Sequence, residues 1–254
     1  MDNKTKGAWL LHHTDKLQKV TNQGDFQKIY LAGKCGVLLS ALSESENESR
    51  LNKAKVDVIA KASDINTVFQ LPIILDKLEE HRLIDRDSKG NVAVLGITTP
   101  TVLNYTNTIF EQAQPNASEL ASLDIAELTS ETPKDKSVVS EYLSDTYRIS
   151  SSDIQDFLTQ SEQIGFIDSE SIERSKDKMY FNGNLFRKGE LKKIDSVLSS
   201  LTSEELKKHL EFTQLLDSKG CITHTKGLEI LGEQLFNKLH SIAIFDVNTV
   251  SNDS

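Results

Sequence analysis

Apolar side chains recur along most of the chain at the three- and four-residue spacing of amphipathic helices. The first well-defined run predicts successive elements in the order helix, helix, helix and hairpin, over residues 26–42, 55–62, 69–81 and 83–95. The third helix places Leu71, Ile74, Leu75 and Leu78 on one face. Its Pro72 falls in the first turn, where a missing N–H costs little.

The N-terminal residues predict a different element. Ala8–Leu11 and Leu17–Val20 are short apolar runs, and His12-His13-Thr14-Asp15 separates them. Two short apolar runs around a polar tip predict a hairpin that precedes the first helix.

The order of elements over residues 51–97 resembles that of a winged helix. In particular, the segment ILDKLEEHRLIDR, residues 74–86, is similar to the end of the recognition helix and the start of the wing in bacterial winged-helix regulators. The resemblance implies a mostly α fold with small β-hairpin wings (α+β). It leaves the function open, because this fold also mediates protein contacts.

An internal repeat extends this interpretation. Three segments share a helix end, an apolar run and an aspartate, and the aspartates are Asp85, Asp168 and Asp246, 83 and 78 residues apart. We therefore expect tandem winged-helix units whose hairpins start at these aspartates. The sequence stops where the third hairpin would return, and two interpretations stay open: a truncated member of a longer family, or a degenerate last unit.

The repeat and the connecting segments predict a division of the chain into six parts. These are an N-terminal hairpin and helix (1–50), a first unit (51–115), a linker helix (116–132), a second unit (133–184), a connecting helix (185–202) and a third unit (203–254) that is incomplete under the first interpretation.

Composition narrows the class of protein. Apolar residues make up 37% of the chain, which is enough for a folded core, and no apolar run approaches a membrane span. The apolar stretch near the N-terminus is too short for a signal peptide. Cys35 and Cys221 are far apart, so we expect them to be reduced and unpaired in a cytoplasmic protein without membrane partners.

The sequence contains no pattern that predicts catalysis. It has neither a phosphate-binding loop nor a dinucleotide fingerprint, and no serine lies in a nucleophile elbow. His209, His224 and His240 have no carboxylate at a recognisable ligand spacing. His12 and His13 next to Asp15 could contact a metal, but adjacent histidines point opposite ways on a strand. We therefore expect no enzyme activity, no cofactor and no metal.

Two classes of partner remain, and the oligomeric state is left open. The first hypothesis is a DNA-binding transcriptional regulator, in which double-stranded DNA meets the helix starts and the wings. Its candidate contacts are Thr67, Gln70, Arg86, Lys89, Arg174, Lys176 and Lys178. The alternative is a protein-interaction subunit of a larger assembly. It is favoured by the net charge of −9 and by the scarcity of basic groups on the recognition helices.

Overall fold

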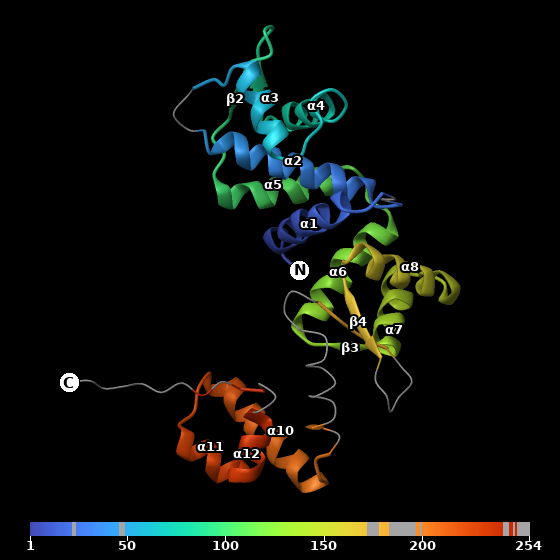
Figure 1. Ribbon diagram of the computed structural model, residues 1–254, viewed down its shortest axis with the longest axis vertical. Helices are drawn as coiled ribbons and strands as arrows, with labels where there is room; N and C mark the ends of the chain where they lie inside the picture. The colour runs from blue at the N-terminus through green and yellow to red at the C-terminus, as the bar shows by residue number, and fades with distance from the viewer. Residues whose placement is uncertain are drawn as a thin grey trace, which may run out of the picture. The chain divides into compact units, whose positions relative to one another are not determined.

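A computed structural model describes residues 1–21, 24–45, 49–171, 178–182, 197–198, 200–240, 244–245 and 247. Most of these residues are helical, and the strands are short and antiparallel (Figure 1). The chain divides into two compact units. The N-terminal unit comprises residues 1–169 and 178–182, and the C-terminal unit holds the helices that follow residue 200.

The expected N-terminal hairpin is wrong. Residues Asn3–Gln18 form one helix, α1, which begins where the Asp2 carboxylate accepts a hydrogen bond of 2.8 Å from the Thr5 amide. Its inward positions include His13 and Thr14 beside Leu10 and Leu17. Because two of these buried side chains are polar, the helical periodicity is hidden in the sequence.

Helix α1 packs against α2 (Gln27–Ser43) and α5 (Thr99–Gln112), and the three lie side by side (Figure 1). Glycines permit the close approach. A Cβ atom on Gly7 would lie 2.2 Å from the Leu103 carbonyl oxygen, and one on Gly33 would lie 1.8 Å from the Thr14 hydroxyl. The three-helix layer therefore depends on positions that carry no side chain.

The first module, residues 27–94, contains α2, α3 (Lys53–Ala62), α4 (Leu71–Glu80) and a hairpin of β1 (Ile84–Arg86) and β2 (Val92–Val94). Leu51 adds a further bridge, because it exchanges backbone hydrogen bonds of 2.7 and 2.8 Å with Val92. The predicted helices and hairpin of this region are confirmed, with α4 beginning two residues later than expected.

The second module, residues 117–181, begins with α6 (Ala117–Glu131). Its other elements are β3 (Lys134–Asp135), α7 (Lys136–Tyr147), α8 (Ser151–Ile164), β4 (Asp168–Ser171) and β5 (Lys178–Phe181). The sheet order is β3-β5-β4. Helix α6 packs against α7 and β5, so it is the first helix of this module and not the linker expected at 116–132.

The two modules share one topology, and the spacing between them is 83 residues from the first strand position to the first hairpin strand. Residues 83 positions apart occupy the same place in the two modules. Leu51 and Lys134 lie at the first strand position, and Lys53 and Lys136 begin the next helix. Asp85 and Asp168 lie in the first hairpin strand. Buried positions correspond as well: the pairs are Val56 and Val139, Leu71 and Ile154, Ile74 and Phe157, and Ile84 and Ile167. The repeat inferred from the first two aspartates is therefore structural.

A buried carboxylate joins the two modules. Glu119 of α6 accepts hydrogen bonds from the backbone amides of Lys28 (2.7 Å) and Ile29 (3.3 Å) in the first turn of α2. Its second oxygen accepts from the Asn116 amide at 3.0 Å and completes the capping box of its own helix. One side chain thus supplies acceptors to the starts of two helices, whose amides would otherwise be unsatisfied.

The C-terminal unit contains α10 (Ser203–Lys219), α11 (His224–Leu231) and α12 (Glu233–His240) around a small core of Phe212, Leu231, Leu235, Phe236 and Leu239. Residues 221–223, between α10 and α11, form no strand. Asp246, expected to start a third hairpin, and most of the connecting helix at 185–202 lie outside the described residues. Within the described part of the chain, no helix is both long and apolar enough to cross a membrane.

Candidate binding surface

The surface expected to carry function begins at the turn between α3 and α4. The Asn66 side-chain oxygen accepts hydrogen bonds of 2.9 Å from the amides of Val68 and Phe69, so it caps the turn that leads into α4. This cap turns the side chains of Val68 and Phe69 outward, and they are 71% and 74% exposed. Ile73, one helical turn further, is 52% exposed.

One of the two DNA contacts predicted at this turn, Gln70, makes its hydrogen bonds within the protein. Gln70 accepts a hydrogen bond of 2.9 Å from the Asn66 amide, and its amide nitrogen donates to the Tyr30 hydroxyl at 3.3 Å. Thr67 is half-buried at the start of the turn. The leading surface of α4 is therefore dominated by apolar groups.

A buried lysine holds this turn against α2. The Lys34 ammonium donates to the carbonyl oxygens of Ser63 (3.2 Å) and Asp64 (2.8 Å), which follow the last residues of α3. A cation suits the carbonyl end of a helix, where the helix dipole is negative. Burial lowers the pKa of Lys34, and its hydrogen bonds replace the lost water. The role of Lys34 is not predictable from local sequence, because its partners lie about thirty positions away.

Arg86, a predicted DNA contact, folds back onto α4. Its guanidinium donates to Glu79 at 3.0 Å and to Asp76 at 2.7 Å, and its own amide donates to Glu79 at 3.2 Å. The hydrogen bond from Arg86 holds the pKa of the Glu79 carboxyl below its usual range. Arg86 therefore fastens the wing to the helix.

The second module repeats this fastening at the equivalent position. Glu162, 83 residues after Glu79, accepts hydrogen bonds from the Ser169 hydroxyl (2.8 Å) and from the Lys178 ammonium (3.1 Å). Lys178, another predicted DNA contact, is thus also held by a glutamate of its own module. The remaining two, Arg174 and Lys176, lie outside the described residues.

The tip of the first wing keeps two available cations. Lys89 is exposed beside Gly90, whose positive φ of 80° forms the turn. Lys53, at the start of α3, lies against the same tip, since a Cβ on Gly90 would lie 3.4 Å from its Cδ. Within the described part of the chain neither ammonium has an acidic partner at ion-pairing distance, whereas Arg50 next to them is held by Asp85.

The corresponding helix start in the second module is polar. At the 83-residue spacing, Ser152 is equivalent to Phe69 and Asp156 is equivalent to Ile73. Ser152 and Asp156 are both exposed. Helix α8 contains no lysine or arginine. The fold therefore accepts polar groups at these positions, and the apolar groups of α4 are not required by packing.

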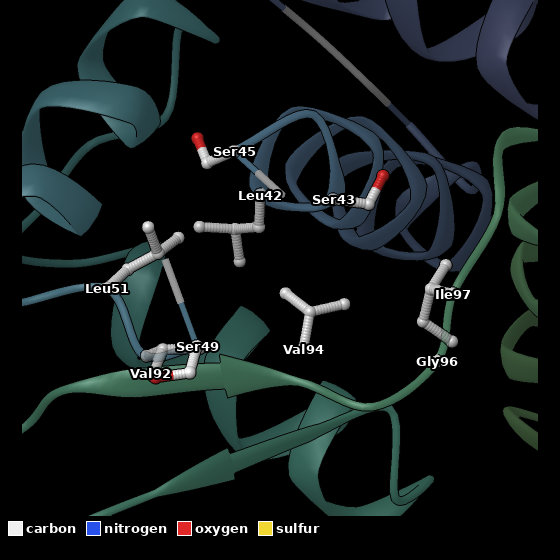
Figure 2. Close-up of a pocket in the computed structure, with 9 residues that line it drawn as sticks. All are labelled: Leu42, Ser43, Ser45, Ser49, Leu51, Val92, Val94, Gly96 and Ile97. Atoms are coloured by element: carbon white, nitrogen blue, oxygen red, sulfur yellow. The ribbon is translucent and has the colours of Figure 1, made fainter. Parts of the chain in front are cut away.

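A cavity of about 250 Å³ lies at the base of the first wing (Figure 2). Its apolar walls are Leu42, Leu51, Val92, Val94 and Ile97, and its rim carries the hydroxyls of Ser43, Ser45 and Ser49. The described residues that line it are uncharged, and most of its walls are apolar.

The described residues show little reactive chemistry. They contain no group of three or more His, Cys, Asp or Glu side chains that could hold a metal ion. Both cysteines are free, and burial raises the pKa of the Cys35 thiol to about 12, which makes it a poor nucleophile. His13 is buried between the Phe166 ring, stacked at 3.9 Å, and the Ser122 carbonyl oxygen.

Comparison of the chain with known protein families, with curated proteins and with solved structures finds no match.

Proposed function

We propose that the two modules are tandem winged helices and that the protein is a protein-interaction subunit of a larger assembly, which docks through α4. The observation that carries the proposal is the exposure of Val68, Phe69 and Ile73 at the start of this helix. Winged helices that read DNA place hydrogen-bonding side chains here, because base edges present donors and acceptors. Exposed bulky apolar groups favour a protein surface instead.

The charges support the same proposal. Arg86 and Lys178 are held by glutamates, and α8 carries Asp153, Asp156 and Glu162 without a basic residue. An acidic recognition helix in a chain of net charge −9 repels phosphates at long range.

Double-stranded DNA binding is the second candidate, and one observation favours it. Lys53 and Lys89 lie together at the tip of the first wing, where wings of this fold contact the backbone of DNA. Such contacts would be made to phosphates, and they would add affinity without reading sequence.

Two matched double variants distinguish the candidates. Phe69→Ser with Ile73→Asp introduces the side chains that the second module carries at these positions, and Lys53→Ala with Lys89→Ala removes the wing cations. Each variant is first checked for unchanged helix content by circular dichroism. Partners of the tagged full chain are then isolated from its own cells, purified and titrated against all three proteins.

We expect the α4 variant to weaken the partner's binding by at least about tenfold, because two central apolar contacts are each worth about 1 kcal/mol or more. The wing variant should bind the partner as the unsubstituted chain does. A gel shift of duplex DNA that weakens with added salt, and that is lost in the wing variant alone, would establish the second candidate instead.

A further inference from the structure

The solvent face of α4 has two halves of different chemistry. Ile73 precedes Asp76 and Glu80 along one face of α4, since these positions are three to four residues apart, and Phe69 is exposed in the turn just before the helix. The Asp76 and Glu80 side chains are 67% and 61% exposed. The face therefore changes from apolar to acidic along about three helical turns.

A pocket adjoins the apolar half. It has a volume of about 230 Å³ and lies between α2 and α4. Its apolar walls are Tyr30, Leu31, Ile73 and Ile74, and its polar lining residues are Gln27, Lys34 and Gln70. Ile73 belongs both to the exposed stripe and to the pocket wall. A bulky apolar side chain of a partner that packs on Phe69 and Ile73 can therefore enter this pocket.

The acidic half carries more negative charge than its own cations neutralise. Lys77 pairs with Glu80 at 2.6 Å, and Arg86 is shared between Asp76 and Glu79. Three carboxylates thus face two cations. Because Asp76 and Glu80 keep most of their surface in water, they can accept further hydrogen bonds from a basic partner.

We propose that α4 receives an amphipathic helical segment of a partner protein, with apolar anchors at one end and lysine or arginine one to two turns further along. This inference rests on the proposed docking function and names the chemistry of the partner. A helix surface offers side chains and no free backbone groups, so it suits a packed helix and not an added strand. Charge complementarity sets the direction in which the segment lies.

A displayed peptide library tests this inference without a known partner. The full chain is the bait, and peptides that also bind the Phe69→Ser, Ile73→Asp variant are removed. We expect the remaining peptides to carry apolar residues three or four apart and to be enriched in lysine and arginine on one side of them. Helix content of representative synthetic peptides is measured in the complex by circular dichroism.

A second bait, Asp76→Asn with Glu80→Gln, keeps the shape of the face and removes its charge. With this bait we expect the apolar spacing to persist and the basic enrichment to disappear. The inference is overturned if no peptide depends on Phe69 and Ile73, if acidic peptides are enriched, or if the basic enrichment survives in the neutral bait. Partner docking through α4 is judged separately by the titrations above, so the two failures are distinguishable.

Discussion

Replacement of Glu119 by glutamine should destabilise the N-terminal unit far more than an ordinary surface substitution. The carboxylate gives one oxygen to the Lys28 and Ile29 amides of α2 and the other to the Asn116 amide of α6. Glutamine has the same shape but only one acceptor oxygen. Whichever helix it serves, its NH₂ group meets the amide donors of the other.

The expected loss follows from these contacts. Hydrogen bonds to a charged group contribute about 1.5–3 kcal/mol each, and the carboxylate also favours the positive ends of two helices. We expect Glu119→Gln to lower the free energy of unfolding by about 2–4 kcal/mol, and Glu119→Ala by about 3–5 kcal/mol because both helices then lose their acceptor.

Urea titration followed by tryptophan fluorescence measures this loss, because Trp9 is the only tryptophan and lies in the same unit. Glu111→Gln is the control: its carboxylate is half-exposed and pairs only with Lys6 at 3.3 Å, so a change within about 0.5 kcal/mol is expected. If Glu119→Gln is no more destabilising than this control, the carboxylate does not hold the two helices together.

Three further predictions concern the same unit and use the same titration. Burial lowers the pKa of His13 to about 3 in the folded protein. Between pH 6.5 and 3 the unfolded chain therefore binds the proton more readily than the folded one, so the free energy of unfolding should fall by up to about 1.4 kcal/mol for each unit by which the pH is lowered. This fall should be shallower in His13→Gln. Equal slopes would contradict this. Gly7→Ala should lower the free energy of unfolding by about 1–3 kcal/mol, because the new Cβ meets the Leu103 carbonyl. This clash should outweigh the higher helix propensity of alanine. A gain in stability would show that α1 and α5 can separate freely. Lys34→Met should cost about 1–3 kcal/mol, since two carbonyls lose their donor, and an unchanged midpoint would count against that role.

Local patterns in the sequence were sufficient for most of the fold. The helices and hairpin of the first module follow from apolar spacing, which acts within a few positions. In the second module, α6 was expected as a linker and α7 was not expected. The N-terminal hairpin was wrong because α1 buries His13 and Thr14, and a polar side chain at an inward position breaks the apolar period.

The candidate surface was less predictable, because its chemistry depends on contacts between distant residues. Arg86 was expected at the surface of the wing, but its partners are Asp76 and Glu79 of the preceding helix. The apolar spacing places Leu71, Ile74, Leu75 and Leu78 on one face of α4; three of them are buried and Leu75 is half-buried against the core. Phe69 and Ile73 lie off this face and are exposed.

The 83-residue spacing allows equivalent positions of the two modules to be compared. Both modules have a glutamate at the same position, Glu79 and Glu162, but its hydrogen-bond partners differ. Glu79 accepts from the Arg86 guanidinium, whereas Glu162 accepts from the Ser169 hydroxyl and the Lys178 ammonium. The outer faces differ, since Phe69 is apolar and the equivalent Ser152 is polar. The two modules therefore keep a glutamate at the same internal position and present outer faces of different chemistry, so a partner that packs on Phe69 is not expected to bind the second module.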